Sequence, residues 1–252
     1  MRPTAATGGG YVLCTSPRSG STLLCDLLKR SGSAGAPESY FLPALIPTFA
    51  RTWGLALARE GWDRSYVEVV RRHGEAGTGR FGMRIMWRDM PAFLQRLEVL
   101  YPCEDTDTGR LRHVLGIDHF VHLSRVDKVA QAVSLVLAAQ TGLWHRNADG
   151  SERERTAPHA EPRYDHDQIA AEFRMLEAEA TGWSEWFKSV GASPITLTYE
   201  ELAADPTDSL ASVLEYIGSS SPSSLGPGTA KLATELNEEW SARFRNERKS
   251  AS

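Results

Sequence analysis

The sequence predicts an α/β fold with a central, largely parallel sheet. Four short apolar runs have the length of buried strands, and the segments between them carry apolar residues at helical spacing. This alternation is typical of βαβ units, in which helices cover both faces of a parallel sheet. The expected strands are residues 11–15, 81–86, 120–123 and 195–198.

A helix is expected after each strand, beginning near Ser19, Pro91, Asp127 and Thr207. A longer helix is expected over residues 165–190, where apolar side chains recur at spacings of three, four or seven and would pack on the sheet. These side chains are Ile169, Phe173, Leu176, Trp183 and Phe187. The polar stretches 147–162 and 219–229 are rich in Pro, Gly or Ser and are interpreted as loops, the first of them mobile.

Length and composition predict one globular domain. The chain has 252 residues, of which 41% are apolar and 24% charged, which is sufficient for one sizeable core. We find neither an internal repeat nor a linker between two independent cores. The expectation is a disordered tail over residues 1–10 and a single domain over residues 11–252.

Charge and cysteine content exclude several classes of function. A net charge of −4 disfavours binding to nucleic acid or to an anionic membrane surface. Cys14, Cys25 and Cys103 lack metal-ligand spacing, and their odd number argues against a disulfide framework, so we expect a cytoplasmic protein. No apolar run approaches the roughly 18 residues of a membrane span, so stable membrane insertion is not expected.

The turn after the first expected strand, SPRSGST, has the composition of an anion-binding site. Ser19 is expected to cap the following helix, and Gly20 would let the backbone approach a ligand closely. The N–H groups of a helix N-terminus, the hydroxyls of Ser21 and Thr22, and the Arg18 guanidinium would together hold a phosphate or sulfate. A helix cap without a ligand is the alternative interpretation of this turn.

The same turn lacks the GxxxxGK[ST] pattern of nucleotide triphosphatases, which disfavours an ATP-dependent kinase. A second basic residue, Arg125, ends the third expected strand, and Ser134 lies in the helix behind it. The two could bind a second phosphate through a charged group and a hydroxyl. Taken alone, Arg125 is more typical of a surface ion pair than of a ligand site.

Seven segments occur in an order that spans nearly the whole chain. They are SPRSGSTLL, GAPESYF, FGMRIMW, RVDKVAQAVSL, GWSEWF, ITLTYEEL and EEWSARFR. Together they resemble the sulfotransferases that use 3′-phosphoadenosine 5′-phosphosulfate (PAPS), and more narrowly the bacterial trehalose 2-sulfotransferase family.

The resemblance implies a P-loop-like sulfotransferase that transfers a sulfuryl group from PAPS to a hydroxyl of a carbohydrate or small metabolite. Its cofactor-binding residues would be Arg18, Ser19, Gly20, Ser21 and Thr22 for the 5′-phosphosulfate, with Arg125 and Ser134 for the 3′-phosphate. Arg18 is also expected to act in catalysis. No metal is needed, because these groups neutralise the charge that grows on the leaving phosphate. A homodimer is left open.

Two positions depart from the family pattern. Relatives carry a general-base Glu where this chain has Ser39, so the neighbouring Glu38 is the expected catalytic base. Adjacent residues in an extended chain point to opposite faces, so a different base, such as His122, or feeble catalysis are the alternatives. Sugar-binding relatives carry Gln in place of Pro17, which weakens trehalose as the acceptor.

The acceptor pocket is expected near residues 42–63, which differ from the family pattern and are apolar and aromatic. Glu38, Ser39 and Trp53 are assigned to acceptor binding. Packing of the aromatic rings on one another is the alternative, and it is favoured for Phe49. The runner-up function is a noncatalytic nucleotide-binding module that keeps the fold without a base.

Overall fold

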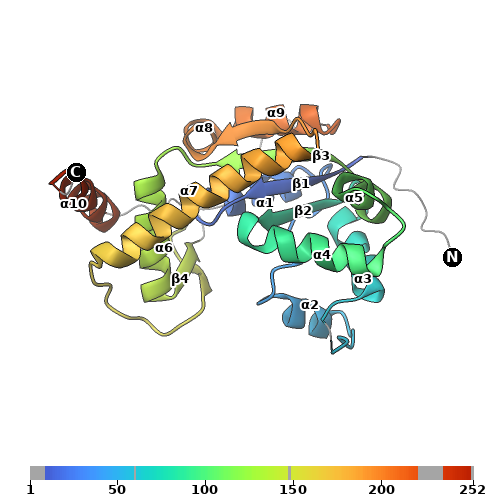
Figure 1. Ribbon diagram of the computed structural model, residues 1–252, viewed down its shortest axis with the longest axis horizontal. Coiled ribbons are helices and arrows are strands. Elements are labelled where there is room, and N and C mark those ends of the chain that lie inside the picture. Colours follow the sequence, from blue (N-terminus) through green and yellow to red (C-terminus); the bar gives the residue numbers. More distant parts are fainter. Residues whose placement is uncertain (1–8, 60, 147–148, 221–234, 251–252) are drawn as a thin grey trace.

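The computed structural model, shown in Figure 1, contains a four-stranded parallel sheet with strand order β2-β1-β3-β6. It describes residues 9–59, 61–146, 149–220 and 235–250. The strands are β1 (Gly10–Thr15), β2 (Gly82–Met86), β3 (Ile117–Ser124) and β6 (Ile195–Thr198). Each contains or coincides with most of an expected strand, and the α/β prediction is confirmed.

Strand β1 lies between β2 and β3, and all six of its residues are buried. Side chains alternate across a strand, so Val12 and Cys14 enter one hydrophobic cluster while Tyr11 and Leu13 enter another. A strand covered on both faces must be apolar at successive positions, which explains the continuous apolar run in the sequence.

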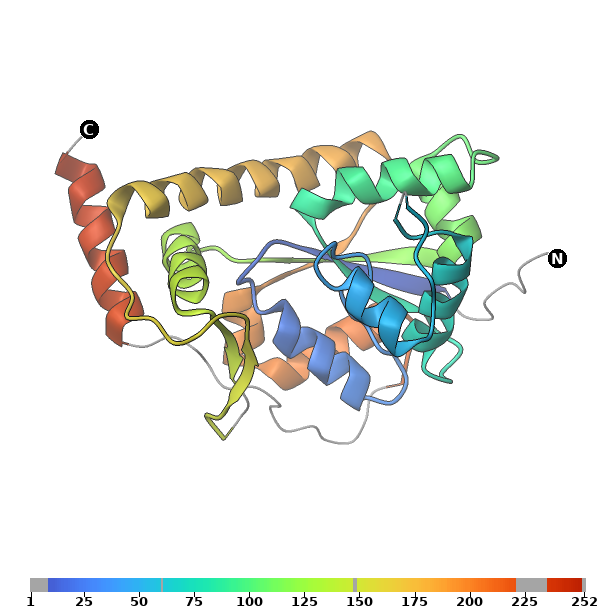
Figure 2. The ribbon, with the colours of Figure 1, turned by 90° about the horizontal axis from the view of Figure 1, so that it is seen from below.

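Helices cover both faces of this sheet, as the edge-on view in Figure 2 shows. On one face pack α3 (Arg64–Glu75), α4 (Met90–Leu100), α5 (Asp107–Leu115) and α7 (His166–Ser189). On the other face pack α1 (Ser21–Arg30), α8 (Tyr199–Ala204) and α9 (Pro206–Tyr216). The remaining helical elements are α2 (Ile46–Thr52), the 3-10 helix η1 (Trp87–Asp89), α6 (Lys128–Thr141) and α10 (Glu235–Ser250).

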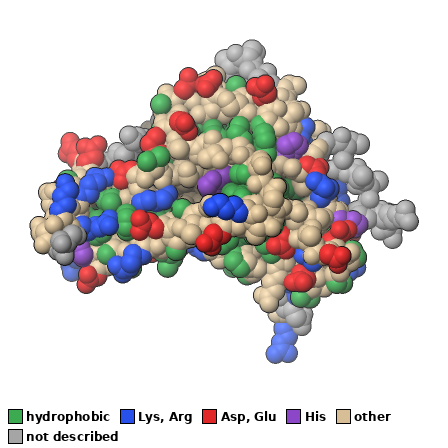
Figure 3. Space-filling view, turned by 45° about the horizontal axis from the view of Figure 1, so that its top comes forward, with side chains coloured by type: hydrophobic (Ala, Val, Ile, Leu, Met, Phe, Trp, Pro, Cys, Tyr) green, Lys and Arg blue, Asp and Glu red, His purple; other side chains and the backbone are tan. Residues whose placement is uncertain are grey.

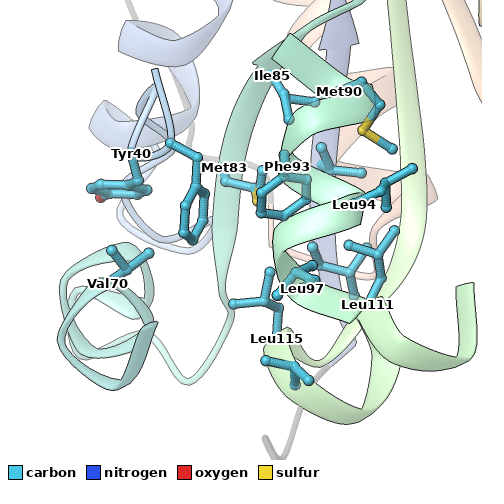
Figure 4. Packing of buried hydrophobic residues seen from close by; sticks show 14 of the residues in the cluster. Tyr40, Val70, Met83, Ile85, Met90, Phe93, Leu94, Leu97, Leu111 and Leu115 are labelled. Carbon is cyan, nitrogen blue, oxygen red and sulfur yellow. The ribbon is translucent and has the colours of Figure 1, made fainter. Parts of the chain in front are cut away.

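The larger cluster fills the face covered by α3, α4, α5 and α7. Figure 4 shows Met83 and Ile85 of β2 beside Phe93 and Leu97 of α4. A third cluster joins α6, α7 and α10 and includes Trp240. It holds α6 against α7.

The observed helix starts agree closely with those predicted from the sequence. Asp127 and Asp165 cap α6 and α7, with their side chains accepting from Ala130 N and Gln168 N. Helix α4 begins at Met90, one residue before the expected Pro91. These starts can be predicted because only a few residue types, Asp among them, cap the free N–H groups of a helix N-terminus well.

One expected loop contains a strand. Within the stretch 147–162, β5 (Glu152–Arg155) pairs antiparallel with β4 (Leu143–Arg146), so the prediction of a loop is wrong at residues 152–155. The sequence ERER lacks the apolar alternation of a half-buried strand, because three of its four residues are exposed.

Several expectations fall outside the described residues. Of the predicted tail, residues 1–8 are not described, and β1 begins at Gly10. Of the loop predicted over 219–229, residues 219–220 lie outside any helix or strand, and the rest are not described. Among the described helices, none has the length and apolarity to cross a membrane.

Candidate active site

The candidate site lies at the carboxyl-terminal edge of the parallel sheet. There β1 leads into α1, β3 leads into α6, and the β4-β5 hairpin follows α6 (Figure 2). In open α/β sheets ligands bind outside the carboxyl ends of the strands. The turn that the sequence marks as an anion site is therefore in the expected place.

Buried hydrogen bonds fix the shape of the β1-α1 turn. The hydroxyls of Thr15 and Ser19 are 2.5 Å apart, and both side chains are buried. Gln131 of α6 donates through Nε2 to Ser16 Oγ at 3.1 Å and to Pro17 O at 2.6 Å. The turn is thus held from both sides before any ligand arrives.

The N-cap of α1 is Gly20, not Ser19, so that prediction is wrong. The Ser19 hydroxyl is used by Thr15 inside the turn. Gly20 has a φ of 85°, in the left-handed region. No described side chain caps this helix, which leaves the N–H groups of its first turn available to an anion.

Replacing Gly20 with alanine should cost about 1–3 kcal/mol of folding free energy. Both the positive φ and a Cβ placed 2.7 Å from the Tyr199 ring are unfavourable. Gly54→Ala is the matched control, since Gly54 has a φ of 67° but open space around it. Urea denaturation measures both changes, and an equal loss for the two variants would show that the Tyr199 contact is unimportant.

Arg18 extends from the turn towards α6 and the hairpin. Its Nε donates to Ser134 Oγ at 3.0 Å and its Nη1 donates to Trp144 O at 2.5 Å. Burial, and then the neighbouring Arg125, lowers the Arg18 pKa to about 10, so the side chain is still charged at neutral pH. Its φ of 62° is unusual for a residue other than glycine, and such strain is concentrated at functional sites.

Arg125 lies behind the same turn. Its Nη1 donates to Arg18 O at 3.3 Å, and its guanidinium stacks over the Tyr199 ring at 4.6 Å. The buried Arg125 Nε has no hydrogen-bond partner among the described residues. Buried donors are nearly always paired, so this atom indicates a place for an acceptor. The structure therefore brings together Arg18, Arg125 and Ser134.

Arg84 of β2 is a site residue that the sequence analysis missed. Its Nε donates to Ser39 Oγ at 2.8 Å, and its Nη1 donates to Thr22 Oγ1 at 3.0 Å and Ser21 Oγ at 3.3 Å. The available signal was a lone arginine within the otherwise apolar segment FGMRIMW. The hydroxyls at the start of α1 thus converge on the Arg84 guanidinium.

Glu38 and Ser39 point in different directions. Ser39 is buried, with 3% of its surface exposed, and contacts Arg84. The Glu38 carboxylate forms an ion pair with Lys29. The two neighbouring side chains therefore contact different cations.

His145 of β4 is the second residue that the sequence analysis missed. Its Nε2 lies 3.2 Å from Thr22 Oγ1 and 3.5 Å from Glu154 Oε2. Burial, followed by the charges of Arg18 and Arg84, lowers the His145 pKa to about 3, so the imidazole is neutral at pH 7. No motif in the sequence marks this histidine.

The other candidates pack with aromatic rings. Trp53 stacks on Phe49 and on His73, with ring centroids 4.9 Å and 4.5 Å away. His122 lies against Trp183 and Phe187, and burial lowers its pKa to about 4. The packing alternative thus accounts for these contacts of the Trp53 ring.

A cavity of about 210 Å³ opens beside Arg18 and Ser134, between α6, the hairpin and the start of α10. Its apolar wall includes Leu137, Ala138, Leu143, Pro162 and Leu236. On the face shown in Figure 3, acidic and basic side chains are interspersed, in agreement with the net charge of −4. Attraction of an anion must therefore come from the local arginines.

Comparison with known proteins identifies the class of protein to which the chain belongs. The model of a family described as Stf0 sulphotransferase matches residues 10–247. The trehalose 2-sulfotransferase of Mycobacterium tuberculosis (strain ATCC 35801 / TMC 107 / Erdman) is 30% identical over 259 residues, covering 94% of each chain. That of Mycolicibacterium smegmatis (strain ATCC 700084 / mc(2)155) is 30% identical over 262 residues, again covering 94% of each.

The fold and these matches define a sulfotransferase, an enzyme that moves a sulfuryl group from a donor to an acceptor. The chain belongs to the Stf0 sulphotransferase family. The resemblance inferred from the seven sequence segments is confirmed.

Proposed function

We propose that the protein transfers a sulfuryl group from PAPS to a hydroxyl of a carbohydrate or small metabolite. The observation that carries this proposal is the grouping of three arginines around the β1-α1 turn: Arg84 bonds the hydroxyls at the start of α1, Arg125 bonds the Arg18 carbonyl, and Arg18 itself belongs to the turn. They are accompanied by the hydroxyls of Ser21, Thr22, Ser39 and Ser134. Such a set of charged donors and hydroxyls fits a ligand with several anionic groups.

We call this set of arginines and hydroxyls the cradle; it consists of Arg18, Arg84, Arg125, Ser21, Thr22, Ser39 and Ser134. Arg18 and the N–H groups of the β1-α1 turn hold the 5′-phosphosulfate, with Ser19 and Gly20 shaping the turn. Arg125 and Ser134 hold the 3′-phosphate, and the unpaired Arg125 Nε supports this assignment. The donor supplies the sulfuryl group and a phosphate leaving group, and the arginines stabilise the charge that develops on that phosphate.

In this proposal the acceptor hydroxyl belongs to a carbohydrate or a small metabolite. Trehalose is the first compound to test, because both relatives are named for it. Pro17 offers no side-chain hydrogen bond to a sugar. Other sugars and small alcohols should therefore be tested beside trehalose. Ser39 and Trp53 are the residues proposed to contact the acceptor, and Glu38 joins them if its pair with Lys29 opens.

Two measurements test the proposed function. Calorimetry with 3′-phosphoadenosine 5′-phosphate, the desulfated product, tests donor binding. Radiolabelled PAPS incubated with trehalose and with pooled bacterial metabolites tests transfer. Binding with labelled acceptor supports the proposal, binding without any labelling favours the noncatalytic module, and absence of binding contradicts both.

The 3′-phosphate assignment predicts a selective loss in two variants. Arg125→Ala and Ser134→Ala should weaken binding of 3′-phosphoadenosine 5′-phosphate while leaving adenosine 5′-monophosphate nearly unaffected. The Ser134 change removes one hydrogen bond, so a loss of roughly fivefold is expected, and the Arg125 change should cost roughly tenfold or more. Calorimetry measures both ligands, and equal losses for the two would assign these residues to the fold.

A further inference from the structure

We propose that His145 accepts the proton of the acceptor hydroxyl during sulfuryl transfer. This inference rests on the proposed function, since it needs a donor bound at the start of α1. Its structural basis is the contact between His145 Nε2 and Thr22 Oγ1 at 3.2 Å. That contact places the imidazole beside the hydroxyls at the start of α1.

The groups around Thr22 leave few candidates for a base. The described side chains that share hydrogen bonds with Thr22 or Arg84 are Ser21, Ser39 and His145. Serine hydroxyls are too weakly basic to accept a proton at neutral pH, whereas a neutral imidazole has an open lone pair. Of these side chains, His145 alone has the chemistry of a general base.

The two bases expected from the sequence are placed less favourably. Glu38 is engaged by Lys29, and its neighbour Ser39 takes the position against Arg84. His122 lies among the rings of Trp183 and Phe187 rather than at the start of α1. Glu38 and His122 are therefore alternative general bases, and each can be tested by substitution.

The proposed transfer forms one bond to sulfur and breaks another. The acceptor oxygen forms a bond to sulfur while its proton moves to His145 Nε2. The bond between sulfur and the bridging phosphate oxygen breaks, and its electron pair stays on that phosphate beside Arg18. The imidazolium then releases its proton to Glu154, which lies 3.5 Å from Nε2 and is about half exposed, or to water.

Charges around the imidazole make its basicity depend on the ligand. Arg18 and Arg84 face it from the β1-α1 turn and from β2, and Arg153 faces it from β5; all three lower its pKa, after burial. Asp26 of α1 raises it, and Glu154 lies beside it. An anion bound between the arginines offsets their charge, so the His145 pKa should rise when the donor or product is bound.

The first test observes the imidazole directly. Nitrogen-15 NMR of labelled histidines, with and without saturating 3′-phosphoadenosine 5′-phosphate, should show the His145 pKa rising by roughly two units or more, towards the operating pH at which a general base is effective. His145→Gln assigns the signal. A pKa that does not move when the ligand is shown to bind would overturn the inference, whereas failure of the parent protein to bind would overturn the proposed function as well.

The second test separates binding from transfer. His145→Gln should retain affinity for 3′-phosphoadenosine 5′-phosphate within a few fold but lower turnover by roughly 10²–10⁴, the usual contribution of a general base. His113→Gln is the matched control, because His113 is exposed on α5 and remote from the cradle. Glu38→Gln should lower turnover far less than His145→Gln does.

A rescue variant distinguishes a proton acceptor from a merely structural histidine. Ser39→Glu places a carboxylate against Arg84, and in the His145→Gln protein it should restore at least about tenfold of the lost turnover. Thermal denaturation confirms that each variant is folded. If Glu38→Gln abolishes turnover while His145→Gln leaves it unchanged, Glu38 is the base and the inference is wrong.

Discussion

Replacing Arg18 with alanine is expected to lower turnover by roughly a hundredfold or more. Arg18 belongs to the turn where the phosphosulfate is proposed to bind, and its guanidinium is held beside that turn by Ser134 Oγ of α6 and Trp144 O of β4. Charge develops on the leaving phosphate in the transition state, so a fixed cation beside that phosphate contributes most when the bond breaks. Steady-state kinetics with labelled PAPS measures the loss.

Two further variants define the origin of the Arg18 effect. Arg18→Lys keeps the charge without the planar fork and should recover only part of the activity. Arg112→Ala is the control, because Arg112 is an exposed member of an ion pair with Asp118. Unchanged kinetics and unchanged calorimetry in Arg18→Ala would show that the turn does not bind the donor.

The fold was predictable because its signals are local. β1 is buried on both faces and therefore apolar at consecutive positions. α7 has an apolar stripe and a capping Asp165. The hairpin was missed because β5 is a charged strand with little buried surface, so nothing in its composition separates it from a loop.

The site was only partly predictable, since it is assembled from distant parts of the chain. The turn SPRSGST and the pair Arg125 and Ser134 follow strand ends, where parallel sheets bind ligands. Arg84 and His145 lie 62 and 123 residues from Thr22 in sequence, and only the fold brings them to it. The capping role given to Ser19 failed because Thr15, four residues earlier, takes its hydroxyl.

Arg84 links both halves of the cradle, because one guanidinium bonds Ser39 on one side and the α1 hydroxyls on the other. If these hydroxyls contact the transferring sulfuryl group, Arg84 is positioned to stabilise its oxygens. Arg84→Ala is then expected to lower turnover by roughly 10²–10³, the usual effect of removing one donor aimed at developing charge. Affinity for 3′-phosphoadenosine 5′-phosphate, which lacks the sulfuryl group, should fall much less.

A structural role for Arg84 makes a different prediction. If Arg84 only holds Ser39 in place, then Ser39→Ala should reduce turnover as much as Arg84→Ala does, since either change removes the 2.8 Å hydrogen bond. If Arg84 acts on the sulfuryl group, Ser39→Ala should cost only a few fold, and Arg84→Lys should be intermediate because it keeps the charge. Arg80→Ala is the control, because this arginine near the start of β2 bonds backbone carbonyls outside the cradle. Equal losses in Arg84→Ala and Ser39→Ala, with folding unchanged, would remove Arg84 from the catalytic groups.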